Sequence, residues 1–458
     1  MSYEVRYLDT AGAVKVKFPP GPRLPFAHLA RFFRDPYHSL EYAYRRYGPV
    51  LSLPGGSFGE RTVLVGDPEL IKQVFVAGPR RFHTGEGNAL MLEPVVGENS
   101  ILSLDEDRHR RSRKIMVPPL QASRIQGYEP VMTEIVDREI DRMPVGEPFP
   151  LVRSLRGVAL EVLMRLMLGM RDEQRLARFR AAVEPVATPP NVITWIPQLR
   201  RDLGRWSPWT RFVRTRDRLY RLLEEEIALR RAEPDLEERD DILSLLVQAH
   251  DDEGRPLTDI EVRDEMMGVM GAGHHTTTAA VAWMFDQLLR DGELEQQLRA
   301  DIDAGEDRWL HATIQETLRW RAPIYGVPRK TMQDIEIGDW RLPAGAYLAL
   351  ILHLVHRRPD LYDDPEAFRP ARFLDKEPDP LLWIPFGGGE RKCIGARFAL
   401  TEMKVIARTI LSRVRLSKVD QRRERPKMSY VIIFPGRGVE VTVSERLPAR
   451  QPELAAAR

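Results

Sequence analysis

The sequence predicts a mainly helical protein with small β-sheets, an α+β fold class. Apolar side chains recur at helical spacing through most of residues 120–250, and again from residue 259 to about residue 290. Shorter strand-like pieces, bounded by glycine and proline, occur at residues 50–65, 334–352 and 429–436. The helical segments are longer and more numerous than the strands, so we expect helices to form most of the core.

The composition is that of an ordinary globular protein. Hydrophobic residues make up 43% of the 458 residues, and 69 basic residues nearly balance 67 acidic ones. The basic residues are scattered among acidic ones, which gives no case for nucleic-acid binding. No apolar run approaches the roughly 18 residues that span a bilayer, and the first residues lack the apolar region of a signal peptide. We therefore expect a cytoplasmic protein with no membrane anchor.

The N-terminal part predicts an extended lead-in, a helix and a hairpin. Four prolines within residues 19–25 favour a stiff, extended chain. Helical spacing follows around residues 27–47, and two strand-like pieces at 50–53 and 61–65 flank a proline–glycine turn. Residues 83–103 are interrupted by glycine, asparagine and proline, so we expect an irregular packed loop there.

Helical patterns fill the middle of the chain. A basic run begins one helix, on which His109 and Arg113 share a face at i and i+4. Prolines and apolar residues break the pattern at 187–199. Thr258 and Glu261 then form a capping box, which predicts the start of the longest helix.

The longest predicted helix has glycines and histidines at its centre. Gly268, Gly271 and Gly273 each cost roughly 1 kcal/mol relative to alanine. The cluster therefore needs a reason, which is either a flat cofactor or ligand against the backbone or close packing with another helix. His274 and His275 are adjacent and point about 100° apart, so we do not expect them to share one role.

The only cysteine, Cys393, lies between a glycine run at 387–389 and a helical pattern that begins near residue 396. One cysteine excludes an intrachain disulfide. A helix N-terminus and the nearby cations Arg391, Lys392 and Arg397 favour a thiolate, which is a good ligand for a soft metal. From local chemistry alone, a small buried hydrophobe and a phosphate-cradling loop remain alternatives.

A motif around this cysteine resembles a known family. Phe386, Gly389, Arg391, Cys393 and Gly395 match F-x-x-G-x-R-x-C-x-G, the haem-thiolate signature of the cytochrome P-450 superfamily. The resemblance implies haem b as cofactor, with Cys393 as the axial thiolate of its iron. It also implies the fold of that superfamily, in which a long central helix and the cysteine loop sandwich the haem. A thiolate ligand favours O–O bond cleavage.

The resemblance also assigns roles on the distal side of the haem. Ala272, Gly273 and Thr276 match the A-G-x-[D/E]-T segment, in which the threonine helps to deliver protons to dioxygen. His275 stands where the family has an acid. Since histidine titrates near neutral pH, we expect His275 to serve in the proton relay instead.

Further matches concern the haem propionates, a charge triad and the substrate pocket. His109, Arg113, Arg329 and Arg391 match positions that bind propionates, and Glu316, Arg319 and Arg372 match a buried structural triad. Buried ions are tolerated when they are mutually paired. The residues expected to line the substrate pocket are Leu90, Met91, Met270, Ile324, Tyr325, Val327, Tyr430 and Ile432.

Together these features predict a haem-thiolate monooxygenase that inserts one atom of O2 into an apolar organic substrate, of the terpenoid, steroid, fatty acid or polyketide class. Only 65 residues follow Cys393, so electrons are expected from a separate ferredoxin or flavodoxin with its NAD(P)H reductase. The alternatives are a peroxide-driven haem hydroxylase and a non-catalytic haem-containing ligand-binding or sensor protein. We expect a monomer with an N-terminal extension at 1–18, one catalytic domain at 19–445 and a disordered tail at 446–458.

Overall fold

The computed structural model describes the chain except for residues 1–3, 8–15, 23–24, 57–58, 252 and 449–458. Helices dominate it, which confirms the predicted class. In chain order, the α-helices are α1 (Pro25–Arg34), α2 (Pro36–Tyr47), α3 (Pro68–Val76), α4 (Gly85–Val96), α5 (Glu106–Met116), α6 (Ala122–Arg142), α7 (Leu151–Val162), α8 (Glu173–Ala187), α9 (Asn191–Trp195), α10 (Pro208–Arg231), α11 (Ile242–Gln248), α12 (Asp259–Leu288), α13 (Gly292–Asp303), α14 (Arg308–Trp320), α15 (Leu352–His356) and α16 (Ala396–Arg413).

The largest sheet has five strands in the order β2-β3-β9-β6-β4. Its strands are β2 (Val50–Gly56), β3 (Gly59–Val65), β9 (Tyr347–Leu350), β6 (Val327–Thr331) and β4 (Phe82–His83). The predicted hairpin at 50–65 is confirmed, since β2 and β3 pair antiparallel with Val50 opposite Val65. Strand β3 then pairs in parallel with β9, which brings distant parts of the chain together.

Three smaller sheets complete the β-structure. Strand β1 (Val5–Tyr7) pairs with β7 (Ile335–Ile337), which also pairs with β8 (Trp340–Leu342). Strand β13 (Glu440–Arg446) lies between β10 (Val414–Lys418) and β5 (Phe149–Pro150). Strands β11 (Pro426–Ser429) and β12 (Ile432–Pro435) form the predicted C-terminal hairpin. Part of the expected N-terminal extension is thus a strand of a sheet.

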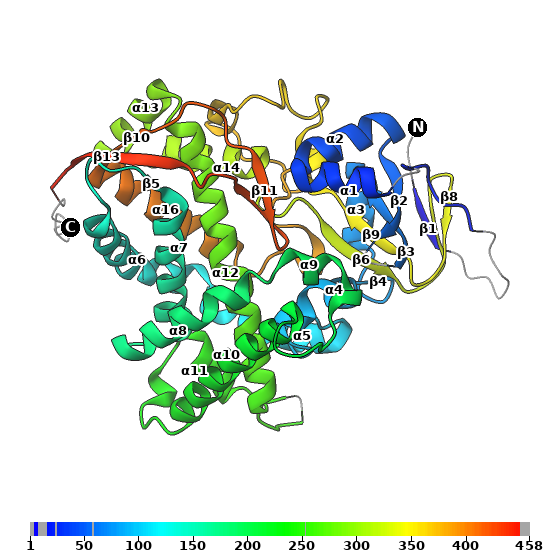
Figure 1. Ribbon diagram of the computed structural model, residues 1–458, viewed down its shortest axis with the longest axis horizontal. Coiled ribbons are helices and arrows are strands. Elements are labelled where there is room, and N and C mark those ends of the chain that lie inside the picture. Colours follow the sequence, from blue (N-terminus) through cyan, green and yellow to red (C-terminus); the bar gives the residue numbers. More distant parts are fainter. Residues whose placement is uncertain (1–3, 8–15, 23–24, 57–58, 252, 449–458) are drawn as a thin grey trace.

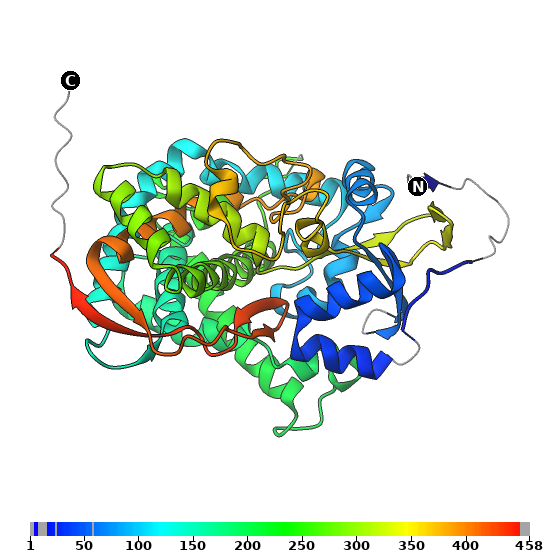
Figure 2. The same cartoon turned by 90° about the horizontal axis from the view of Figure 1, so that it is seen from above.

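Figures 1 and 2 show the sheet-rich part, with α1 and α2, at one end of the molecule and the larger helical part at the other. Helix α12 crosses the helical part and contacts α7, α10, α14 and α16. Its capping box is formed as predicted: the Thr258 hydroxyl accepts from the Glu261 N–H, and the Glu261 carboxylate accepts from the Thr258 N–H. Among the described residues, no helix is long and apolar enough to cross a membrane.

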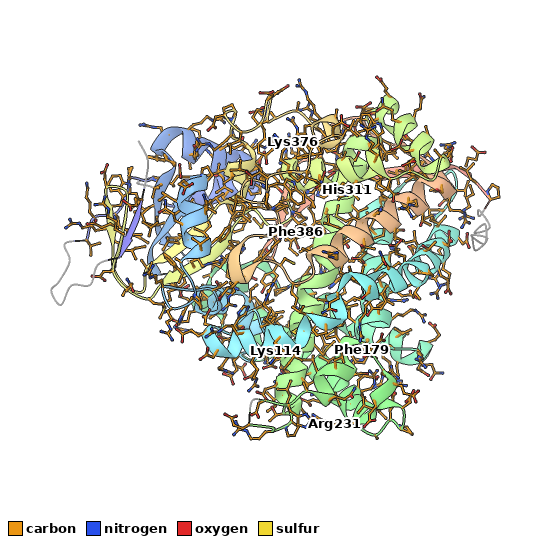
Figure 3. All side chains as sticks on the ribbon, turned by 180° about the vertical axis from the view of Figure 1, so that it is seen from behind. Lys114, Phe179, Arg231, His311, Lys376 and Phe386 are labelled. Carbon is orange, nitrogen blue, oxygen red and sulfur yellow. The ribbon has the colours of Figure 1, made fainter. Side chains whose placement is uncertain are left out.

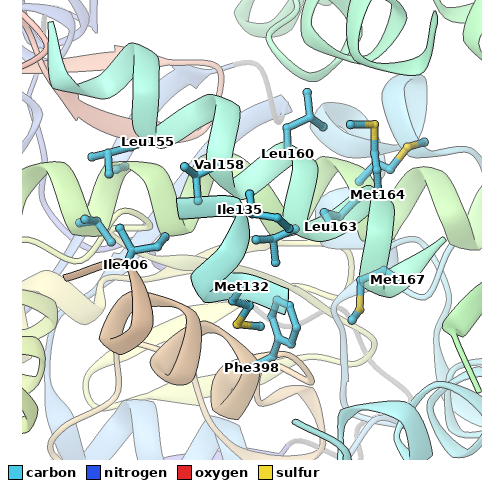
Figure 4. Packing of buried hydrophobic residues seen from close by; sticks show 14 of the residues in the cluster. Met132, Ile135, Leu155, Val158, Leu160, Leu163, Met164, Met167, Phe398 and Ile406 are labelled. Atoms are coloured by element: carbon cyan, nitrogen blue, oxygen red, sulfur yellow. The ribbon is translucent and has the colours of Figure 1, made fainter. Parts of the chain in front are cut away.

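The main hydrophobic core lies between α6, α7, α12 and α16. Figure 4 shows Met132 and Ile135 of α6 close to Phe398 and Ile406 of α16, with Leu163 near them. Leu163 opens a five-residue π-helical turn, Leu163–Met167, that continues α7. This core fixes where α16, and therefore the cysteine loop before it, stands relative to α12.

The expectation of an irregular loop at residues 83–103 was wrong, because Gly85–Val96 form α4. The cap of this helix is remote in sequence. The carboxylate of Asp105 accepts hydrogen bonds from the backbone N–H groups of Thr84, Gly85 and Glu86, each at 2.9 Å. These groups have no partner inside the helix, and an acidic residue some twenty positions away satisfies them.

Two other segments differ from the predicted pattern. The single helix expected around residues 27–47 is two helices, because Asp35 ends one and caps the next by accepting from the His38 N–H at 3.1 Å. The proline-broken segment at 187–199 contains the short helix α9 and a 3₁₀ turn, Pro197–Leu199. The last ten residues of the expected tail lie outside the described residues.

Candidate functional site

The cysteine loop is held by close backbone contacts. Gly387 and Gly389 adopt left-handed conformations, with φ of +68° and +65°. A Cβ on Gly389 would lie 2.2 Å from the carbonyl oxygen of Phe75, so no larger residue fits there. The N–H of Cys393 donates to the carbonyl of Phe386 at 2.9 Å. Figure 3 shows Phe386 near the middle of the molecule, seen from behind.

The thiol of Cys393 is accessible to solvent although protein atoms surround it. Desolvation raises its pKa, and this effect outweighs a hydrogen bond from the Gly395 N–H and the charges of Arg113 and Lys392. We expected the helix end and the nearby cations to favour a thiolate. In the protein without a cofactor they do not, because burial favours the neutral thiol more strongly. A bound metal cation would deprotonate a coordinating thiol.

The middle of α12 presents an accessible strip within an otherwise buried helix. Ala272 is exposed and Thr276, one turn later on the same face, is half-buried, whereas the residues from Thr277 to Phe285 are buried. The Thr276 hydroxyl donates to the Ala272 carbonyl at 2.7 Å. The sequence thus places a hydroxyl and a small side chain on the accessible strip in the middle of α12.

Two of the three glycines of α12 lie where a side chain would collide with a neighbouring residue. A Cβ on Gly273 would lie 2.4 Å from Cδ1 of Leu163, and a Cβ on Gly268 would lie 2.3 Å from the hydroxyl of Ser100. Only Gly271, with Val96 at 3.5 Å, has room for ordinary contact. Of the two reasons that the sequence left open, close packing with another helix accounts for Gly273, which faces Leu163, whereas Gly268 packs against Ser100 in the segment between α4 and α5.

His274 and His275 are both fully buried, and their ring centroids are 4.0 Å apart. His274 Nδ1 is 2.7 Å from the Met270 carbonyl, while neither ring nitrogen of His275 has a partner among the described residues. The His275 ring meets Phe434 edge to face at 5.9 Å. Desolvation, with the charges of His274 and Arg156, lowers the pKa of His275 to about 2. The sequence argument assumed titration near neutral pH, whereas here the ring is neutral.

Several basic residues lie near Asp105 and the cysteine loop. Arg391 donates to Asp105 and to the carbonyls of Leu104 and, at 3.3 Å, Ile101. Burial and the charge of Arg391 lower the pKa of Arg329 to about 9, and the Arg329 guanidinium donates to the Pro328 carbonyl at 2.7 Å.

Two more basic residues belong to this cluster. Burial, with the charges of Arg391 and Arg113, lowers the pKa of His109 to about 3, so this buried imidazole is neutral. Burial likewise lowers the pKa of Arg391 to about 10, so the guanidinium remains charged at neutral pH. Arg113 and Arg329 thus both lie near the charge of Arg391, which pairs with Asp105.

These residues fit a haem. Arg329 is a buried guanidinium, and within the described part of the chain its one hydrogen bond is to the Pro328 carbonyl; such burial is costly unless an anion pairs with the charge. Haem carries two carboxylates that would do so, and guanidinium–carboxylate pairs are the strong charge-assisted kind. An accessible thiol and an uncovered strip of a central helix suit its iron and its flat ring.

The predicted triad residues lie together in the interior. Arg319 donates to both carboxylate oxygens of Glu316, at 2.6 and 2.8 Å, and Arg372 lies 3.1 Å from the same carboxylate. Glu316 and Arg319 are fully buried. Arg319 also donates to the carbonyls of His356, Pro365 and Ala367, so the triad fastens α14 to residues 356–367.

Sequence reasoning missed the residues that connect this triad to the cysteine loop. The Trp383 indole donates to the Gln315 carbonyl at 3.1 Å, and the Ile384 N–H donates to Nε2 of His356 at 3.0 Å. It also missed Glu402 of α16, a fully buried acid. No local pattern marks these residues, because their partners lie far away in sequence.

The residues expected to line the substrate pocket come from several parts of the fold. Met270 and Ile432 belong to the main core, as does Tyr430. Tyr325 packs against Phe32 at 5.4 Å between ring centroids. The remaining members are half-buried: Leu90, Met91, Ile324 and Val327.

Tyr430 links two of these parts. Its hydroxyl donates to the Met91 carbonyl of α4 at 2.8 Å, and its N–H donates to Oδ1 of Asn191 of α9 at 2.9 Å. The turn of the C-terminal hairpin, α4 and α9 are therefore joined at one residue.

Comparison with known proteins gives a consistent picture. A family model described as Cytochrome P-450 matches residues 19–443. A provisionally named cytochrome P-450 135B1 of Mycobacterium tuberculosis is 37% identical over 442 residues, covering 94% of this chain and 93% of the relative. Another, cytochrome P-450 135A1 of the same species, is 33% identical over 434 residues, with 94% and 96% covered.

Solved structures share the fold. A cyanobacterial protein, CYP120A1, solved with bound retinoic acid, superposes with a TM-score of 0.81 at 23% identity, covering 94% of this chain and all of that one. The haem domain of cytochrome P450DA gives a TM-score of 0.79 at 22% identity, covering 94% and 98%. These likenesses extend over nearly the whole of each chain.

Proposed function

This chain belongs to the cytochrome P-450 family, whose members bind haem and act as haem-thiolate monooxygenases, and from that premise we propose how its residues divide the work. The observation that carries the proposal is the accessible Cys393, which has the charges of Arg113 and Lys392 near its thiol, and the buried Arg329, which lies near Arg391. When bound, haem supplies the redox chemistry that activates O2 for insertion into a substrate. Cys393 would hold its iron, and His109, Arg113, Arg329 and Arg391 would hold its propionates.

Thr276 would hold a proton close to the reacting oxygen. Its hydroxyl is half-buried on the uncovered strip of α12 and has the Ala272 carbonyl as its acceptor. A hydroxyl in that position can donate to an incoming oxygen while accepting from water. His275 would take part only as a neutral imidazole, because burial lowers its pKa to about 2.

The substrate would be an apolar organic molecule. The predicted pocket residues are mainly aliphatic, and Met91 and Met270 are adaptable side chains that fill irregular space. The Tyr430 bonds to Met91 and Asn191 would keep α4 and α9 close together and so limit the entry of water.

The electrons would come from a separate ferredoxin or flavodoxin served by an NAD(P)H reductase. Lys392 and Arg397, on either side of Cys393, are exposed. Exposed positive charges attract an acidic partner and speed the encounter. The docking surface would therefore lie on the cysteine side of the fold.

The test is the spectrum of the reduced protein with carbon monoxide. Purified protein is expected to show the strongly red-shifted Soret band of thiolate ligation. Cys393→His is expected to retain haem without that band, because an imidazole replaces the thiolate. Arg329→Leu, by contrast, is expected to lower haem retention and leave the band position unchanged. A wild-type protein that remains colourless after expression with ample haem precursor would overturn the proposal.

A further inference from the structure

A crevice lies between α8 and α10, which pack against each other in the helical part of the fold (Figure 1). Its volume is about 230 Å³, and the residues that line it are Arg178, Arg218, Arg221, Leu222 and Glu225. A water molecule takes up about 30 Å³ of liquid, so this space can hold more than a single small ion. None of these five residues is among those assigned to the haem or to the substrate pocket.

Two of the three arginines of the crevice have no carboxylate partner. Arg178 of α8 pairs with Glu225 of α10, with 3.2 Å between Nη2 and Oε2. Arg218 and Arg221 are exposed, and within the described part of the chain neither forms an ion pair or a side-chain hydrogen bond. The crevice thus combines three guanidinium groups with one carboxylate, which leaves two positive charges uncompensated.

The acids of the two helices are all occupied by other arginines. Those of α10 are Asp217, Glu224, Glu225 and Glu226, and each pairs with an arginine other than Arg218 or Arg221. The same holds for Glu173 and Glu184, the acids of α8. The two helices therefore supply no counter-charge for Arg218 and Arg221.

The spacing of these arginines works against the helix that carries them. Arg218 and Arg221 lie three positions apart on α10, and the exposed Arg214 precedes Arg218 by four. Like charges at these spacings repel each other across one helical turn and slightly destabilise the helix. An anion bound in the crevice would relieve this repulsion.

A phosphate monoester has the charge and shape that suit this crevice. It carries close to two negative charges at neutral pH, which match the two uncompensated positive charges. Planar guanidinium groups bind phosphate oxygens through paired hydrogen bonds. The side chain of Leu222 is buried and gives the crevice an apolar wall for the organic part of the molecule. A single carboxylate would neutralise only one of the two charges.

We propose that the crevice between α8 and α10 is a binding site for a small organic phosphate, whose phosphate group is held by Arg178, Arg218 and Arg221. Glu225 competes with this ligand for Arg178. The site is separate from Cys393 and from the predicted substrate pocket, so the inference does not depend on the proposed activity.

The test is titration calorimetry of the haem-loaded full chain with phenyl phosphate. Phenyl phosphate is expected to bind more tightly than benzenesulfonate, which has the same ring and a single charge. Arg218→Gln and Arg221→Gln are each expected to weaken the binding of phenyl phosphate by about tenfold, since each variant loses a charge-assisted hydrogen bond. Glu225→Gln is expected to strengthen it severalfold, because the competing carboxylate is gone.

Arg211→Gln is the matched control. Arg211 is an exposed arginine of the same helix, about two turns before Arg218, and it does not line the crevice. Its replacement removes the same charge and is expected to leave the affinity for phenyl phosphate close to that of the wild type. Circular dichroism of each variant checks that α10 is still folded.

Three results would overturn the proposal. The first is wild-type protein that does not bind phenyl phosphate at millimolar concentration, or Arg218→Gln and Arg221→Gln variants that bind it as well as Arg211→Gln does. The second is binding through these arginines to vesicles of phosphatidylglycerol but not to phenyl phosphate, because a lipid headgroup would then be the anion. The third is a dimer that Arg221→Gln dissociates, because carboxylates of a second copy would then be the counter-charges.

Discussion

Among single residues, Glu402 of α16 shows how burial sets a protonation state. Its side chain is 1% exposed, and neither carboxyl oxygen has a hydrogen-bond partner of ordinary geometry in the described part of the chain. The nearby Thr277 hydroxyl favours the ionised form only weakly, and desolvation raises the pKa of Glu402 to about 8. The native protein therefore holds this proton at neutral pH.

Glu402→Gln is expected to flatten the pH dependence of stability. Between pH 4.5 and pH 8 the native state keeps the proton that the unfolded state releases, so wild-type stability falls as pH rises through this window. Glutamine does not titrate. The free energy of unfolding of the variant, relative to wild type, should therefore increase by up to a few kcal/mol from pH 5 to pH 8. Denaturant titrations at both pH values measure it, and parallel profiles would contradict the expectation.

His275→Ala is expected to reduce the coupling of NAD(P)H oxidation to product and to divert electrons to peroxide. The neutral imidazole of His275 can donate one proton and accept another, whereas an alanine side chain can do neither. Because burial holds the His275 pKa near 2, the loss should be the same at pH 6 and pH 8. Peroxide yield and product yield measured together give the result. Unchanged coupling in the variant would remove His275 from the relay.

At the scale of elements, α4 is the clearest case in which sequence and structure differ. Its glycines, asparagine and proline favour a loop, yet Asp105 satisfies the free N–H groups at its start. The same carboxylate pairs with Arg391. A propensity argument sees only neighbours along the chain, so a cap supplied from the next helix is invisible to it. The capping box of α12 was predictable, by contrast, since both of its partners lie within four residues.

Asp105→Ala is expected to unfold the first turn of α4. Removing an N-cap acceptor costs about 1 kcal/mol, and here three donors lose their partner at once. Hydrogen exchange of the amides of residues 84–88 should accelerate, while exchange in α12 stays unchanged. Asp107→Ala is the matched control, because the Asp107 side chain is 87% exposed and pairs with Arg110 across one turn of the helix. Equal exchange in the two variants would show that Asp105 is not the cap.

At the scale of the whole molecule, the buried triad joins regions that the sequence separates widely. Glu316 accepts from Arg319, from Arg372 and from the Arg369 N–H at 2.7 Å. The motif made these three residues predictable as a set. Their connection to the cysteine loop through Gln315, His356 and Trp383 was not, because it depends on backbone carbonyls and one imidazole nitrogen that carry no sequence signature.

Glu316→Gln is expected to destabilise the protein by about 3–5 kcal/mol, since it leaves the fully buried guanidinium of Arg319 and the partly buried one of Arg372 without their counter-charge. Glu69→Gln is the control, because its pair with Lys72 is exposed and such pairs contribute about 0–1 kcal/mol. Chemical denaturation of both variants compares the two. If both variants lost a similarly small free energy of unfolding, the triad would contribute no more to stability than an exposed ion pair does.

The accessible Cys393 is also the only sulfhydryl in the sequence. An alkylating reagent can therefore modify a single position in the native protein, and each molecule can take up one label at most. If the cofactor occupies that sulfur, the unlabelled fraction in intact-mass spectra counts the loaded molecules directly. The fraction of chains that have taken up the cofactor can therefore be measured from the labelling of one sulfur atom per chain.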